Sequence, residues 1–122
     1  MNKFLINYAC MKPFTMPDTI QNRLKEKIQK SDFFVTDEKG THRLVGMRYD
    51  PQKMLSPEIT CICMRHEMSV AKMLAFNEGK KIYYHSKVSA RIFQYYEGEE
   101  IRIEDFNIIA ILYADFFFKK KD

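Results

Sequence analysis

The chain has 122 residues and a mass of 14.6 kDa, enough for one hydrophobic core and too little for two independent ones. Hydrophobic residues make up 46% and charged residues 30%, a balance typical of folded globular proteins rather than of disordered chains. The net charge of +4 comes from lysines and arginines scattered among acids, which favours an acidic protein partner or a mildly basic surface over a dedicated nucleic-acid binder. No apolar run reaches the ~18 residues of a transmembrane helix, so we expect no transmembrane segment. The N-terminal apolar patch is short and interrupted by Asn7, a poor secretion signal, so we expect a cytoplasmic chain.

The start of the chain differs from the rest. Residues 1–17 contain Pro13 and Pro17 and show no clear hydrophobic period. We therefore expect a flexible N-terminal arm, which becomes ordered only when it docks on something. Residues 18–122 are predicted to form a single domain.

The elements of this domain follow from hydrophobic periods. Spacings of three and four residues predict helices, and short apolar or alternating runs between turn signals predict strands. In chain order we expect a helix over 18–30, strands over 33–36, 42–49 and 58–64, a helix over 67–78, a strand over 81–85, a short helix over 87–96 capped by Ser86, and a last helix from about Ile103. The predicted fold class is α/β, a small mixed β-sheet of about four strands surrounded by about four helices.

The strand over 58–64 carries apolar side chains at both parities. Ile59, Cys61 and Cys63 are predicted to share one face, and burial on both faces is typical of a central strand. With the helix that follows it and the strand over 81–85, it would make one βαβ unit, whose two strands are parallel and joined by a right-handed crossover.

The last helix is unusually apolar. Its core-facing stripe is predicted to contain Phe106, Ile109, Ala110, Tyr113 and Phe117. Ile108, Ile111 and Phe116 lie off this stripe. The helix is therefore either deeply buried or offers a second apolar face to a partner.

Two side-chain sets could carry a ligand. Cys61, Cys63 and His66 have C-x-C-x-x-H spacing, but a structural zinc site needs four ligands and no fourth is evident. Tyrosines with nearby lysines could stack on bases, although in these positions they are more typical of a core and its rim. We predict no metal, no cofactor and no nucleic-acid partner. A small metal-binding or nucleic-acid-binding domain remains an alternative.

Several motifs together resemble a known family. The segments "SDFFVT", "THRLVGMRYDPQKMLSPEI", "AKMLAFNEGKKIYYHSKVSARIF" and "GEEIRIEDFNIIAILYAD" are similar to the cytoplasmic domain of the FlhB/YscU/SpaS family, the export-switch proteins of flagellar and type III secretion systems. Its most specific parts are the Thr41-His42 pair before a strand and the residues Tyr49, Asp50, Lys53, Met54, Pro57, Ala90 and Arg91. The resemblance covers residues 18–115 and implies a small mixed sheet surrounded by helices.

The resemblance also marks one loop. Family members have Asn-Pro-Thr-His there, and the asparagine amide nitrogen attacks its own carbonyl carbon, forms a succinimide and expels the proline nitrogen. This chain instead has Asp37, Glu38, Lys39, Gly40, Thr41 and His42. Asp37 is the nearest substitute for the asparagine, but its carboxylate is ionised near neutral pH, given a reference pKa of ~3.9, and no proline follows it. We predict that self-cleavage is lost and that the chain is not an enzyme.

The resemblance implies a role in protein export or in switching substrate specificity, carried out by protein–protein binding. The implied partners are export-apparatus proteins, export substrates or a length-control protein, and such partners would bring the chain to the membrane export apparatus. The last helix and the Thr41-His42 loop are the candidate surfaces. The alternative within the same family is an export-switch protein that still cleaves itself slowly in the loop.

Overall fold

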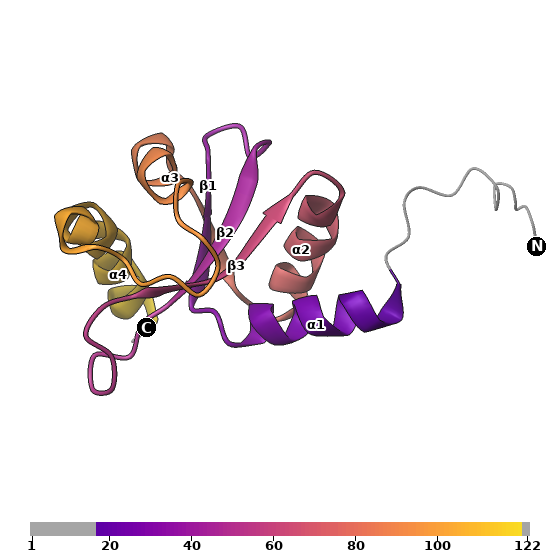
Figure 1. Ribbon diagram of the computed structural model, residues 1–122, viewed down its shortest axis with the longest axis horizontal. Coiled ribbons are helices and arrows are strands. Elements are labelled where there is room, and N and C mark those ends of the chain that lie inside the picture. Colours follow the sequence, from indigo (N-terminus) through magenta and orange to yellow (C-terminus); the bar gives the residue numbers. More distant parts are fainter. Residues whose placement is uncertain (1–16, 121–122) are drawn as a thin grey trace, which may run out of the picture.

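Nine elements follow one another in residues 17–120, the part of the chain that this computed structural model describes (Figure 1). They are α1 (Asp18–Gln29), β1 (Phe33–Thr36), β2 (Arg43–Arg48), β3 (Glu58–Met64), α2 (His66–Asn77), β4 (Lys81–Tyr84), α3 (Ser86–Ile92), the short 3₁₀ helix η1 (Ile103–Asp105) and α4 (Phe106–Lys120). The predicted class is confirmed, because a mixed four-stranded sheet is combined with four α-helices. The predicted arm lies outside the described residues, apart from Pro17.

The four strands form one sheet in the order β3-β2-β1-β4. β1 is antiparallel to β2 and parallel to β4, with Phe34 opposite Gly46 on one side and Ile82 on the other. Since β2 is also antiparallel to β3, β3 and β4 run in the same direction, as predicted. They are not neighbours, however, and β3 is an edge strand. The prediction of a central strand is wrong, because helices on both sides of the sheet bury an edge strand as well.

A β-bulge in β3 changes which side chains face which helices. The register shifts after Gly46, which lies opposite Cys61, so that Thr60 is the extra residue of the bulge. Ile59 packs in the core beneath α3 and α4, whereas Cys61 and Cys63 pack in the core beneath α1 and α2. The predicted common face of these three residues is therefore wrong, because one extra residue shifts the alternation of the strand.

Two pairs of helices cover the two faces of the sheet (Figure 1). α1 and α2 enclose a smaller core that contains Leu24, Ile28, Phe34, Leu44, Cys61, Cys63, Met68, Ala71 and Ala75. α3 and α4 enclose a larger one that contains Phe33, Val35, Val45, Met47, Ile59, Val88, Ile92, Tyr95, Ile101, Ile109, Leu112 and Tyr113. Within residues 17–120, no helix has the length and apolarity to cross a membrane.

The helix α3 starts differently from the prediction. Ser86 is its first residue rather than its cap, and His85 takes the capping position, where its Nδ1 accepts a hydrogen bond from the backbone N–H of Val88 at 3.2 Å. An imidazole nitrogen thus satisfies a free N–H of the first turn, a role usually filled by Ser, Thr, Asp or Asn. α3 ends at Ile92, four residues before the predicted end.

α4 is only partly buried. Ile109 and Tyr113 are buried as predicted, whereas Ala110 is exposed and Phe117 is 37% exposed. Ile111, which lies off the core-facing stripe, is 62% exposed. The helix therefore keeps apolar surface outside the core, in line with the second of the two predicted alternatives.

Candidate functional site

The loop between β1 and β2 is organised around one carboxylate. Asp37 Oδ1 accepts hydrogen bonds from the backbone N–H groups of Thr41 and His42, both at 3.1 Å, and Oδ2 accepts one from the N–H of Lys39 at 3.2 Å. Burial opposes ionisation of Asp37, but the N–H donors of His42 and Thr41 together outweigh it and hold the pKa of Asp37 well below its usual range. Asp37 is therefore an anion that holds the loop closed.

The far side of the loop is held by the neighbouring elements. Gly40 has a φ of +68°, and a Cβ atom there would lie 2.7 Å from Cε2 of Tyr84. Its carbonyl oxygen accepts a hydrogen bond from Nζ of Lys72 on α2 at 2.9 Å. Glu38 accepts one from the hydroxyl of Ser86, at the start of α3, at 2.5 Å. The loop is thus attached to β4, α2 and α3.

The other polar side chains of the loop lie at its surface. His42 is 74% exposed, and its Nδ1 lies 3.4 Å from Oδ2 of Asp37. Both oxygens of Asp37 accept backbone hydrogen bonds, and the loop has neither a side-chain amide nor a proline. These contacts hold it as a fixed surface loop.

The family-like segment after β2 forms a separate turn. The turn is closed at Asp50, whose carbonyl oxygen accepts hydrogen bonds from the backbone N–H groups of Lys53 at 3.0 Å and Met54 at 2.8 Å. The backbone N–H of Tyr49 donates to Oδ2 of Asp32 at 2.7 Å, and the carbonyl of Pro57 accepts from the N–H of Ile101 at 2.8 Å. These hydrogen bonds fix the backbone at the C-terminal end of β2, whereas the loop with Asp37 lies at the other end of the strand.

The third family-like set lies on α3. Ala90 is exposed, whereas Arg91 contacts the buried carboxylate of Asp105 through Nε at 2.7 Å and Nη2 at 2.5 Å. Asp105 also accepts a hydrogen bond from the hydroxyl of Tyr95 at 2.5 Å. Arg91 therefore links α3 to η1. The predicted site residues accordingly fall in three places, and the structure does not bring them together in one site.

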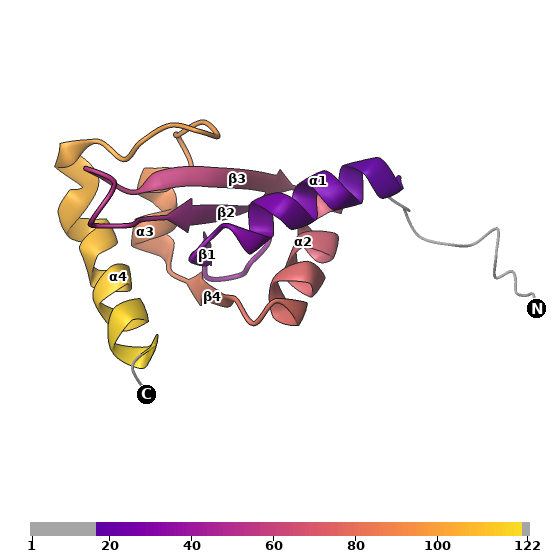
Figure 2. The same ribbon diagram turned by 90° about the horizontal axis from the view of Figure 1, so that it is seen from below.

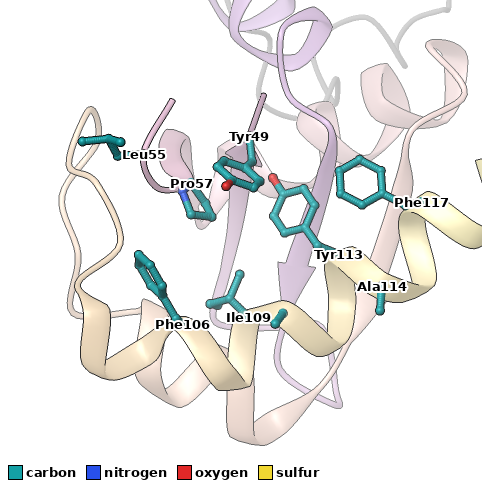
Figure 3. A pocket seen from close by; sticks show the side chains of 9 residues that line it. Tyr49, Leu55, Pro57, Phe106, Ile109, Tyr113, Ala114 and Phe117 are labelled. Carbon is teal, nitrogen blue, oxygen red and sulfur yellow. The ribbon is translucent and has the colours of Figure 1, made fainter. Parts of the chain in front are cut away.

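Two of the predicted residues, Tyr49 and Pro57, line an apolar groove. It has a volume of about 330 Å³ and lies between α4 and the turn after β2 (Figure 3). Its lining consists of Tyr49, Leu55, Pro57, Phe106, Ile109, Ala110, Tyr113, Ala114 and Phe117. Leu55, which is 94% exposed, was not predicted from the sequence, because a single leucine in a polar turn gives no periodic signal.

The cysteines are part of the core. Cys61 and Cys63 are both 1% exposed, and contact with the Cys61 thiol together with burial raises the pKa of Cys63. Among the described residues, no group of three or more His, Cys, Asp or Glu side chains is placed to hold a metal ion. The C-x-C-x-x-H spacing does not produce such a group.

The tyrosines divide between core and surface. Tyr95 is buried, and Tyr83 donates its hydroxyl proton to Asp115 Oδ2 at 2.5 Å. Tyr84 and Tyr96 are 52% and 78% exposed. The four rings thus do not form a single stacking surface.

Solved structures of known proteins share this fold. The cytoplasmic domain of FlhB from Shewanella putrefaciens aligns with a TM-score of 0.70 and 18% identity, over 80% of this chain and 74% of that one. The C-terminal domain of EscU with an asparagine-to-aspartate mutation aligns with a TM-score of 0.71 and 19% identity, over 82% and 92% of the two chains. An EscU domain with a proline-to-alanine mutation gives 0.66 and 18%, over 73% and 87%. No family model and no curated protein sequence matches the chain.

Proposed function

We propose that this protein is a non-cleaving relative of the FlhB and EscU domains, which acts in a type III or flagellar export system by binding other proteins. The observation that carries the proposal is the shared fold over about four fifths of the chain. The sequence resemblance at the Thr41-His42 pair and at the turn after β2 adds support. The role is that of a binding module.

The loop supports the non-cleaving part of the proposal. Cleavage of the resembled kind needs a neutral amide nitrogen that can reach its own carbonyl carbon. Here Asp37 offers only carboxylate oxygens, which accept three backbone hydrogen bonds, and Gly40 is held by Lys72. The loop would therefore keep one covalent and conformational state.

The groove along α4 is the proposed binding surface. Its walls combine exposed Leu55 with the rings of Tyr49, Phe106, Tyr113 and Phe117, and such apolar grooves in soluble domains are typical of sites that bind an apolar segment (Figure 3). The partner would be an export-apparatus protein, an export substrate or a length-control protein. Binding would also bring the chain to the membrane export apparatus.

The intact mass tests the non-cleaving part. Purified full-length protein is incubated for days at neutral and mildly alkaline pH and examined by mass spectrometry. We expect one species at the full-length mass. Two fragments that place a break between Thr36 and Thr41 would overturn this part of the proposal.

Two glutamate substitutions on α4 test the groove. Ala110 lines the groove, whereas Asn107 is exposed on the same helix outside it. In cells with a type III export system, the wild type and Asn107→Glu should co-purify with export-apparatus proteins, and Ala110→Glu should lose them. Equal recovery by the two variants would contradict the role of the groove, and no recovery by the wild type would contradict the proposed function.

A further inference from the structure

The outer edge of β3 is covered along only part of its length. At its beginning, Ile59 donates its N–H to the carbonyl of Glu99 at 2.9 Å, and its own carbonyl accepts from Gly98 at 2.8 Å. In the described part of the chain, no strand pairs with this edge beyond Ile59. At the end of the strand, the N–H of Met64 donates to Oε1 of Glu67 at 3.4 Å. Between these two points, residues 61–63 leave a strand edge to which another extended segment can add.

This edge opens onto a cavity rather than onto a flat surface. The cavity has a volume of about 260 Å³ and is lined by Cys61, Ile62 and Cys63 of β3, by Ile20, Arg23, Leu24 and Lys27 of α1, and by Glu67 and Glu97. Ile20 is 45% exposed although it lies on the core-facing stripe of α1. An apolar side chain placed beside β3 would contact the apolar residues of this cavity, and the charged residues would surround it as a polar rim.

The cavity lies at the start of α1, the place where residues 1–16 join the described part of the chain. Ile20 shares this cavity with Cys63, whereas Lys27 and Lys30 line a neighbouring cavity with Glu58. α1 and β3 therefore run in opposite directions, and the beginning of α1 lies near the end of β3, as Figure 2 shows.

The arm contains one stretch suited to such an edge. Residues 3–10, KFLINYAC, have no proline, and Phe4, Ile6 and Tyr8 alternate with Leu5, Asn7 and Ala9. Aromatic and β-branched residues are favoured in strands. Pro13 and Pro17 follow the stretch instead of interrupting it, as required of a segment that must donate backbone hydrogen bonds.

We infer that residues 4–8 add a strand to the outer edge of β3, alongside residues 61–63. Four strand residues span about 13 Å, and the nine residues from 9 to 17 can extend over about 30 Å, so the connection to α1 is long enough. If the added strand runs parallel to β3, it ends beside the start of α1, so the connection is shorter than for an antiparallel strand. The arm thereby closes the edge of the sheet and fills the cavity with its own apolar side chains.

Amide hydrogen exchange of the full-length protein, followed by NMR, tests this placement. The informative amides are those of residues 60–63 that do not bond to β2, because the N–H of Met64 already donates to Glu67. Ile6→Pro removes a donor in the middle of the added strand, whereas the matched control Lys12→Pro lies in the connection. Relative to the wild type, we expect exchange to be at least about tenfold faster in Ile6→Pro and unchanged in Lys12→Pro, together with wild-type nuclear Overhauser contacts between residues 4–8 and 61–63.

Two results would overturn the inference. Equal exchange rates in the wild type and Ile6→Pro would show that the arm does not cover β3. Protection that rises with protein concentration would show that a second copy of the chain occupies the edge instead. The amides of β1 serve as the internal reference, since their exchange reports the stability of the sheet as a whole.

Discussion

Replacing Asp105 by alanine is expected to break the polar connection between α3 and η1. The side chain is 1% exposed and accepts hydrogen bonds from Arg91 and from the hydroxyl of Tyr95. Burial by itself would raise the pKa of Asp105, but the hydrogen bonds from Tyr95 and Arg91 outweigh burial and lower it. The carboxylate is therefore charged in the folded protein at neutral pH.

The cost of Asp105→Ala has two unequal parts. Arg91 is 49% exposed, so water replaces much of its interaction, and we assign about 1 kcal/mol to this pair. Tyr95 is 1% exposed. Without Asp105 its buried O–H group would have no acceptor, which costs about 1–3 kcal/mol. We expect a loss of about 2–4 kcal/mol in the free energy of unfolding.

Urea denaturation followed by circular dichroism measures this loss. Glu104→Ala is the matched control, because Glu104 is the adjacent carboxylate, is 61% exposed and lies 3.7 Å from Arg102. It should change the free energy of unfolding by less than about 0.5 kcal/mol. Similar losses for Asp105→Ala and Glu104→Ala would refute the reasoning.

Three further changes have expected outcomes. Arg65→Gly should raise the free energy of unfolding by about 1 kcal/mol, because Arg65 has a φ of 54° and a ψ of −121°, a conformation that is unfavourable for residues other than glycine. Thermal melting measures this gain. Arg65→Ala keeps a Cβ atom and should show no gain. Gly46→Ala should lower the free energy of unfolding by about 1–3 kcal/mol, because a Cβ atom there would lie 2.7–2.8 Å from Thr60 Oγ1, Phe34 Cε2 and Ser31 Oγ. An unchanged midpoint of urea denaturation would contradict this. The lowered pKa of Asp105 contributes stability that is complete above its unfolded pKa of ~3.9 and is lost as pH falls through the lower folded pKa. As the pH falls below about 4, the wild type should therefore lose more stability than Asp105→Ala, and equal losses would count against the assignment.

The local elements of this fold are readable from the sequence, whereas their pairing is not. Alternation in the residues around Val45 and Met47 predicts β2, because both the period and the burial are local properties. The edge position of β3 depends instead on β1 pairing with β4, which places Phe33 opposite Lys81. The bulge at Thr60 brings its hydroxyl to that of Ser31 in a buried pair, at 2.5 Å. Neither contact leaves a periodic signal.

The candidate site divides in the same way. The sequence identifies the loop that contains Asp37 and shows that it has no amide nucleophile, but not that Asp37 caps the loop or that Lys72 holds Gly40. Likewise, Arg91 belongs to a family-like pair, while its contact with Asp105 follows only from the packing of α3 against η1. Apolar periodicity indicates that α4 has surplus hydrophobic surface, but the groove also needs Leu55 from a distant turn.

The order in which the sheet is assembled has a consequence for synthesis of the protein. β1 acquires its parallel neighbour only when β4 has been made, and the larger core beneath α3 and α4 includes Ile109, Leu112 and Tyr113 of α4. Pairings of high sequence separation form slowly, and a chain grows from its N-terminus. The apolar face of the nascent sheet, Phe33 and Val35 included, therefore stays uncovered on the ribosome until α4 has left the exit tunnel. During that interval we expect the unfinished domain to expose apolar surface of the kind that chaperones bind.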